Sequence, residues 1–206
     1  MMLDLAPIFP VGMPSLGQSM LIRDRHIDVL GMSRSSLTGK TRLFDWDNQR
    51  FRYEVSLTIL DDTSHQLWKS FFRRVKDSRG LCYFMDPLRT TPQGLMTGTV
   101  VVNGASQTED SLSIDGCTNS LTPWAYAGDY FQLERNMYMI LQDANSDGSG
   151  NATLKIWPRL RRSPADNAPL NCSNPRGVFR VTEIKGFQEQ PVLYDSAGFT
   201  LVEEPQ

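Results

Sequence analysis

Ten consecutive residues, 50–59, alternate between apolar and polar side chains. The apolar members hold the odd positions: Phe51, Tyr53, Val55, Leu57 and Ile59. Successive side chains of a β-strand point to opposite faces, so this period of two predicts an antiparallel strand with one buried face. Turn-forming residues at 47–49 precede it, and 38–40 is typical of another tight connection. We therefore expect a meander of about three strands from residue 28 to residue 60.

The period of the apolar residues changes after residue 60. Leu67, Phe71 and Val75 recur every four residues, and Trp68 and Phe72 repeat that spacing one position on. Apolar side chains at this spacing form a stripe on one face of a helix. We expect a helix over 63–79 with Leu67 and Phe71 on its buried face, because residues four apart lie on the same side.

The ends of this helix carry the usual signals. Asp62 or Thr63 would cap its start, and Gly80 follows a basic last turn. A short apolar strand, 81–85, is then closed by Asp86 and a proline.

The middle of the chain has no helical stripe. Short strand-like runs are separated by turns rich in Gly and Asn, which is typical of a small barrel or sandwich. These runs are 99–102, 111–115, 129–133, 137–142, 152–157 and 178–182, and 196–203 alternates again near the end. The sequence predicts a mainly β protein with one helix.

Composition excludes several classes of protein. Among the 206 residues are three cysteines, an odd number and too few for a disulfide scaffold, and none is in a CxxC pair. The net charge of −2 does not fit a strongly basic nucleic-acid coat. No apolar run approaches the roughly 18–20 residues that cross a membrane, and residues 1–10 lack the pattern of a signal peptide. We expect a soluble intracellular protein that needs no cofactor.

Charge is distributed unevenly along the chain. Residues 1–92 carry 13 Lys and Arg against 10 Asp and Glu, residues 93–178 carry 6 against 8, and residues 179–206 carry 2 against 5. Opposite signs at the two chain ends favour their packing together, although such an effect is weak at surface dielectric.

Two short motifs have a plainer interpretation as turns. Asp143, Asn145 and Asp147 followed by a glycine match the first half of a calcium loop, but its twelfth position, which should be Glu, is Leu154. A polar hairpin turn is the favoured interpretation. The run 39–41 resembles the end of a phosphate-binding loop without its first glycine, and it too is expected to be a hairpin turn.

No catalytic motif stands out. His26 and His65 are the only histidines, which makes a metal triad or a Ser/His/Asp system hard to build. A pair of carboxylates leaves no spacing signature, so that possibility stays open. We expect no enzyme activity, no catalytic residue and no metal site.

Two groups of side chains are candidates for binding. Exposed Trp124, Tyr126 and Trp157 would stack on sugars, although such aromatics more often lie in a core. The basic residues of 159–162 would bind phosphate or sugar, but a solvated turn or a subunit contact is favoured. The candidate subunit-contact cations are Arg50, Arg52, Arg159 and Arg161.

Several segments of the sequence resemble the distal tail protein of long-tailed (siphovirus) bacteriophages, a family of tail-tip adaptors. In the first third they are 33–46, 52–55 and the aromatic helix; in the middle they are 102–107, 111–116, 127–133, 147–154, 156–161, 164–168 and 176–180. Together they cover most of the chain, and they are weakest at 1–25 and 185–206.

The resemblance implies a fold, a role and partners. It implies a belt-type β-sandwich or split barrel with one helix, from residues 1–92 and 179–206, with 93–178 as an inserted small β-barrel similar to oligonucleotide/oligosaccharide-binding barrels. Six copies would form a ring that joins the tail tube to the tail-tip hub and fibre proteins, with DNA passing through the lumen without specific binding. The implied location is the phage tail in the virion, after assembly in the host cytoplasm, with no membrane partner. The family has no catalytic residues to carry over.

Two other functions compete with the structural ring. The inserted barrel would be a host-glycan-binding module of a tail tip, or the chain would be a wall-degrading hydrolase. The scarcity of histidines and the lack of a nucleophile motif count against the hydrolase.

Overall fold

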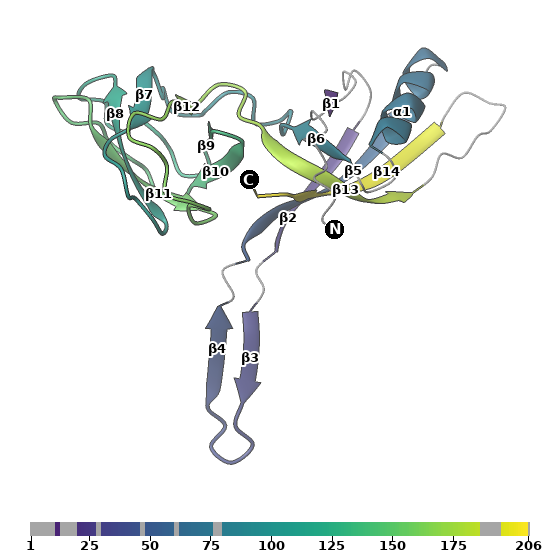
Figure 1. The fold of residues 1–206 in the computed structure, drawn as a ribbon, viewed down its shortest axis with the longest axis horizontal. Helices are drawn as coiled ribbons and strands as arrows, with labels where there is room; N and C mark the ends of the chain where they lie inside the picture. Colours follow the sequence, from purple (N-terminus) through teal and green to yellow (C-terminus); the bar gives the residue numbers. More distant parts are fainter. Residues whose placement is uncertain are drawn as a thin grey trace, which may run out of the picture.

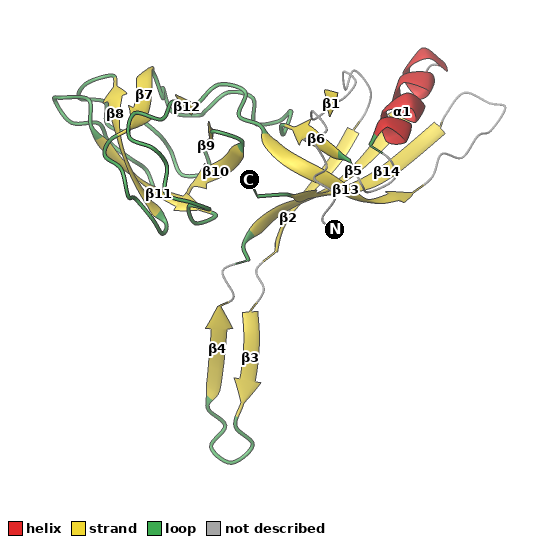
Figure 2. Cartoon of the chain, in the orientation of Figure 1, coloured by secondary structure: helices red, strands yellow, loops and turns green. Residues whose placement is uncertain are grey.

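The computed structural model describes residues 11–12, 20–27, 30–45, 48–59, 62–75, 80–185 and 195–205. Two six-stranded sheets, a separate two-stranded hairpin and one helix make up these residues, so the predicted mainly β class is confirmed (Figure 2). Each expected strand-like run of the middle segment overlaps a strand, although residues 129, 141 and 142 of those runs lie outside the strands.

The first sheet joins both ends of the chain. Its order is β1-β6-β13-β14-β5-β2, and the bounds are β1 Val11–Gly12, β2 Met20–Ile27, β5 Arg50–Ile59, β6 Leu81–Phe84, β13 Gly177–Lys185 and β14 Asp195–Glu203. All neighbours are antiparallel except β1 and β6. The basic N-terminal segment and the acidic C-terminal segment thus share one sheet.

Strand β5 confirms the alternation read from the sequence. Phe51, Tyr53, Val55 and Leu57 are buried, and the residues between them are more exposed. The expected three-stranded meander is wrong, however. Both edges of β5 are taken by β14 and β2, so β5 has no edge left for the preceding strand.

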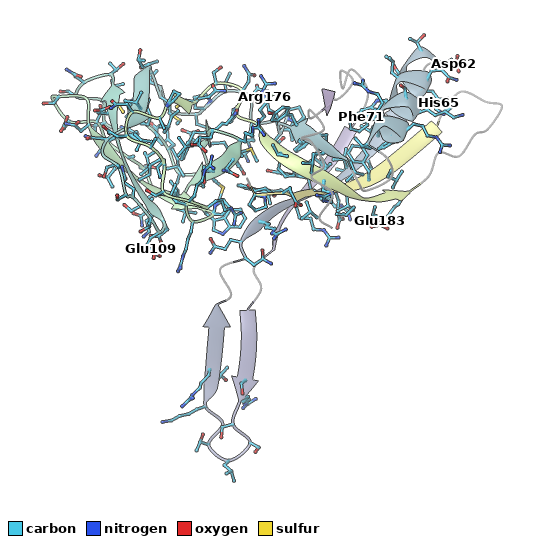
Figure 3. All side chains as sticks on the ribbon, viewed as in Figure 1. Asp62, His65, Phe71, Glu109, Arg176 and Glu183 are labelled. Atoms are coloured by element: carbon cyan, nitrogen blue, oxygen red, sulfur yellow. The ribbon has the colours of Figure 1, made fainter. Side chains whose placement is uncertain are left out.

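Helix α1, Asp62–Arg74, packs on one face of this sheet. Rings of Trp68 and Phe72 lie 5.6 and 5.3 Å from the ring of Phe199 on β14, and Phe71 lies between helix and sheet (Figure 3). Leu67 is 54% exposed, so its predicted burial is wrong. The buried stripe instead runs at spacings of three and four from Trp68 to Val75. Leu67 lies about 100° from Trp68 around the helix axis, so its side chain is outside this stripe.

The helix is also shorter than expected. It ends at Arg74 and not at 79, and residues 76–79 lie outside the described residues. Val75 still donates its N–H to the carbonyl of Phe71 at 2.9 Å.

The second sheet is a nearly closed barrel. Its order is β12-β9-β10-β11-β8-β7, and the bounds are β7 Gly98–Val102, β8 Ser111–Cys117, β9 Tyr130–Leu133, β10 Asn136–Ile140, β11 Ala152–Trp157 and β12 Leu170–Asn171. The two end strands meet through a bridge between Val101 and Pro169 and through the N–H of Val102, which donates to Ala168 at 3.0 Å. Every strand of this barrel falls within the segment 93–178.

The third unit is a β-hairpin formed by β3 (Leu30–Arg34) and β4 (Thr41–Asp45). It extends away from both sheets (Figure 1). At its tip Gly39 has a φ of +67° and donates its N–H to the carbonyl of Ser35 at 3.0 Å. The run 39–41 is therefore a hairpin turn, as expected. All side chains described in this hairpin, 33–42, are exposed.

Candidate functional site at the junction of sheet and barrel

The sheet and the barrel meet at the start of β5, the end of β14 and the loop that follows β11. Phe51 on β5 and Trp157 on β11 pack edge to face, with ring centroids 4.6 Å apart. Phe51 also lies 6.0 Å from the ring of Tyr130 in the barrel. Tyr130 and Met137 belong to the sheet's hydrophobic core although both are barrel residues. The two units therefore share buried apolar surface.

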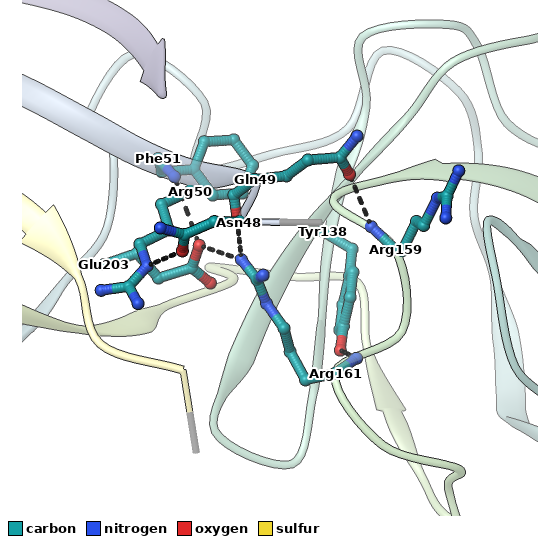
Figure 4. Close-up of polar contacts among 8 residues, drawn as sticks. All are labelled: Asn48, Gln49, Arg50, Phe51, Tyr138, Arg159, Arg161 and Glu203. Atoms are coloured by element: carbon teal, nitrogen blue, oxygen red, sulfur yellow. Dashed lines mark hydrogen bonds and ion pairs between the residues drawn. The ribbon is translucent and has the colours of Figure 1, made fainter. Parts of the chain in front are cut away.

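A buried ion pair crosses this junction (Figure 4). Arg161, in the loop after β11, donates from Nη2 to Oε2 of Glu203 at 3.0 Å. The two side chains are only 11% and 1% exposed. The same carboxylate oxygen accepts the backbone N–H of Phe51 at 3.2 Å. Glu203 thus connects the last strand of the sheet to β5 and to the barrel loop.

Gln49 completes the junction from the segment just before β5. Its backbone carbonyl accepts a hydrogen bond from Nη2 of Arg161, and its side-chain oxygen accepts the N–H of Arg159 at 3.1 Å. Beside it, Nε of Arg50 donates to the side chain of Asn48 at 2.7 Å. These contacts hold the loop after β11 against the sheet (Figure 4).

Two polar atoms of this ion pair have no hydrogen-bond partner. Within the part of the chain that the structure describes, Oε1 of Glu203 and Nε of Arg161 are buried without a hydrogen-bond partner. Burial raises the pKa of Glu203 above its ordinary value, and Arg161, the N–H of Phe51 and Arg50 oppose that shift. A buried pair of this kind adds little net stability, but its geometry specifies how the two units are oriented.

The basic run 159–162 is neutralised by intrachain pairs. Arg159 lies 3.4 Å from Glu109, Arg161 pairs with Glu203, and Arg162 pairs with Glu134. Each acid comes from a different segment of the chain. The run therefore does not form the free cationic surface that phosphate binding needs.

The four candidate subunit-contact cations all have partners within the chain. Arg50 bonds to Asn48, and Arg52 lies 3.7 Å from Glu54. Arg159 and Arg161 both contribute to the junction. The structure assigns these residues intrachain roles, and it brings three of them together at the junction.

The three aromatic candidates lie in three different environments. Trp124 is 0% exposed in the barrel core, and its indole N–H donates to the carbonyl of Thr97 at 3.0 Å, so the expectation that it stacks on sugars is wrong. Trp157 is half-buried against Phe51. Tyr126 is exposed. They do not form a shared stacking surface.

The calcium-like loop is a turn closed by the side chain of Asp147. Oδ1 of Asp147 accepts the N–H groups of Ser149 and Asn151, each at 2.8 Å. Asp143 accepts the N–H of Ala127 at 2.9 Å. Leu154, at the position where the loop should have Glu, is buried in the barrel core. Among the described residues no group of three or more potential metal ligands comes together.

Sequence reasoning missed Glu203 and Gln49. The alternation of the last strand could have revealed Glu203. Phe199, Leu201 and Glu203 are two residues apart and share one face of the strand, and the first two are buried. A glutamate in phase with buried residues predicts a buried charge that needs a partner. Gln49 offered no comparable signal.

No protein-family model matches this chain, and no curated protein matches it either. Of the helices that the structure describes, none has the length and apolar character required to span a membrane.

Proposed function

We propose that this chain is a structural, non-catalytic protein of the tail tip of a long-tailed bacteriophage. Six copies form a ring that connects the tail tube to the tail-tip hub and fibre proteins, and DNA passes through its lumen without specific binding. The protein is assembled in the host cytoplasm and resides in the virion tail. The family and the copy number come from the sequence resemblance; the physical support comes from surfaces that suit subunit contacts.

The hairpin β3–β4 is the observation that carries this proposal. Leu37 at its tip is 95% exposed, and all side chains described in 33–42 are exposed. A two-stranded hairpin is marginally stable alone in water, because it buries little apolar surface. A projecting arm of this kind is stabilised when it packs on another molecule, and a neighbouring copy supplies one in a ring.

The arm is also basic. Arg34, Lys40 and Arg42 lie in its exposed part, and no acid lies among 33–42. We infer that it docks on an acidic surface of the next copy, which gives the head-to-tail contact that closed rings require. Glu203 and Glu204 are not that surface, since Arg161 and Arg180 pair with them in the same chain.

The edge of the first sheet supports the same proposal. Strand β2 has eight residues and, in the described part of the chain, pairs only with β5. Long edge strands expose unpaired N–H and C=O groups and favour pairing with another chain. Leu21 on this edge strand is exposed.

The oligomeric state of the purified full chain tests this proposal. Mass photometry and negative-stain images, with and without purified tail tube protein, are expected to show six-fold rings. Leu37→Asp should reduce ring formation, because a charge at the tip opposes burial. Leu88→Asp is the matched control, since Leu88 is also highly exposed but lies in the turn after β6. A chain that stays monomeric with the tube protein, or forms only two-fold dimers, contradicts the ring.

A further inference from the structure

Three loop segments of the barrel lie side by side at its surface. Ala125 and Ala144 form an antiparallel bridge, which joins the segment before β9 to the turn after β10. The segment before β7 runs beside them, because the N–H of Met96 donates to the carbonyl of Trp124 at 3.0 Å. Residues far apart in the sequence therefore share one small area of the barrel.

The buried carboxylate of Asp129 holds these segments in place. It accepts the backbone N–H groups of Gln93, Gly94 and Tyr126 at 2.6, 3.0 and 2.9 Å. The backbone N–H and C=O of Asp129 are used as well, toward Tyr126 and Ile140. A surface fixed in this way loses little conformational entropy when a partner binds.

Exposed apolar side chains gather on this area. Ala125 and Ala144 are buried, so the residues next to them across the bridge, Tyr126 and Asp143, point outward as direct neighbours. Leu95 and Leu141 lie on the two flanking segments. Leu95, Tyr126 and Leu141 are between 41% and 62% exposed. We call Leu95, Tyr126, Leu141 and Asp143 the barrel patch.

This grouping sets the barrel patch apart from other exposed apolar residues. Leu21, Leu67 and Leu88 lie on three separate elements: β2, α1 and the turn after β6. Single exposed apolar side chains are ordinary, whereas several together mark an interaction site. An exposed tyrosine among leucines is typical of the residues that contribute most to protein–protein binding.

The barrel patch also has an uncompensated negative charge. Asp143 accepts the backbone N–H of Ala127 at 2.9 Å and has no cation partner among the described residues. No Lys or Arg occurs in 93–97, 125–129 or 141–145. Lys155, whose carbonyl accepts the N–H of Leu141, pairs with Asp110 at 2.6 Å. A partner with positive charge is therefore favoured.

The tip of the hairpin β3–β4 has the complementary character. Leu37 is its most exposed apolar residue, and Arg34, Lys40 and Arg42 beside it pair with no other described residue. An apolar side chain flanked by cations matches an apolar patch flanked by an acid. Within one chain the hairpin points away from the barrel (Figure 1), so the contact is between two copies.

We propose that the barrel patch of one copy receives the hairpin tip of the next copy, with Leu37 against Tyr126 and the hairpin cations around Asp143. This inference rests on the proposed ring and names the two surfaces that meet in it. Tip and patch are different surfaces of the same chain. Each copy therefore gives one contact and receives one, which is the head-to-tail arrangement of a closed ring.

Cross-linking in the assembled protein tests this contact. Thr38→Cys lies next to Leu37, and Gln142→Cys lies between Leu141 and Asp143, so both thiols are exposed and leave the contact residues intact. Chains with one variant each are mixed, assembled with the tail tube protein and treated with a short bis-maleimide. A cross-linked pair joining the two variants is expected on a denaturing gel.

Gln66→Cys is the matched control, because Gln66 is an exposed glutamine on helix α1. Mixed with Thr38→Cys, it should give no more product than the unchanged chain, whose half-buried Cys172 sets the background.

A charge variant tests the same contact without cysteines. Asp143→Asn keeps an acceptor for the N–H of Ala127 and removes the charge, so it should raise the concentration for half-assembly about threefold to tenfold. Asp166→Asn is the control. Asp166 is an exposed acid of the same barrel that accepts the N–H of Gly104 at 2.8 Å and lies outside the barrel patch.

Mass photometry separates failure of this contact from failure of the ring. Six-fold rings that lack the cross-link between residues 38 and 142 overturn the contact and leave the ring standing. Equal cross-linking of the residue 66 control, or equal weakening by Asp143→Asn and Asp166→Asn, also overturns the contact alone. A chain that stays monomeric with the tube protein overturns the ring and this inference with it.

Discussion

Glu203 and Arg161 form an ion pair of 3.0 Å across the junction between sheet and barrel, although 42 residues separate them in the sequence. Glu203 ends the last strand of the sheet, and Arg161 lies in a barrel loop. Phe51 and Gln49 bind the same two side chains through their backbones. One carboxylate therefore joins three segments of the chain and fixes where the barrel sits on the sheet.

Removing one partner of this pair should be costly. Arg161→Met leaves the carboxylate of Glu203 buried without its cation, and we expect the free energy of unfolding to fall by about 3–5 kcal/mol. The double variant with Glu203→Gln should recover part of that loss, because the buried charge is gone. Chemical denaturation of the four proteins in this cycle measures the coupling.

Arg162→Met is the matched control, since Arg162 makes a similar pair with Glu134 on an exposed surface. Exposed ion pairs contribute little, so this variant should unfold nearly as the unchanged chain does. Equal losses for Arg161→Met and Arg162→Met contradict the special role of the junction.

The stability of the junction should depend on pH through Glu203. Its pKa is raised in the folded chain, mainly by burial, against the lowering effects of Arg161 and Arg50, while Tyr138 and Tyr53 are the other titratable groups facing it. A raised folded pKa contributes stability at low pH, and that stability is lost as the pH rises through the folded value. Glu203→Gln removes the titration.

The unchanged chain should therefore lose stability relative to Glu203→Gln as the pH rises above the ordinary glutamate value of 4.5. Below that value the difference between the two proteins should be constant. Denaturation midpoints measured from pH 4 to pH 8 check this, and a difference that does not change with pH would count against a raised pKa.

The helix face can be tested with two truncations. Phe71 is buried between α1 and the sheet, so Phe71→Ala should lower the free energy of unfolding by about 3–5 kcal/mol. Leu67 is mostly exposed on the same helix, and Leu67→Ala should change it by no more than about 0.5 kcal/mol. Equilibrium denaturation compares the two variants. A larger loss of unfolding free energy for Leu67→Ala would support the predicted burial of Leu67.

Gly116 should be intolerant of any side chain. It has a φ of +73°, and an added Cβ would lie 2.1 Å from the carbonyl oxygen of Thr99 on the paired strand β7. Gly116→Ala should therefore cost more than the roughly 1–2 kcal/mol of left-handed strain alone. Gly104→Ala is the control, because Gly104 has a φ of +90° but open space at the Cβ position. Thermal unfolding of both variants should show a clearly lower Tm for Gly116→Ala.

Local patterns in the sequence were enough to predict strand β5 and the presence of the helix. Alternation at 50–59 depends on side chains of adjacent residues pointing to opposite faces, and the aromatic stripe near Phe71 depends on the helical repeat. Both patterns need only neighbouring residues, so they are visible without the fold. The turn at 147–151 was predicted for the same reason, since Asp147 bonds to groups two and four residues away.

Tertiary structure decided everything that depends on which strands are neighbours. Strand β4 does not pair with β5, because β14 and β2 occupy both edges of β5. The residues near 41–50 give no sign of which strands will pair with β5. The choice between Leu67 and Trp68 as the start of the buried stripe depended on where the helix meets the sheet, because both spacings are helical. The pair of Arg161 with Glu203 arose in the same way: each charge is ordinary in its own segment, and only the docking of barrel on sheet brings the two together out of water.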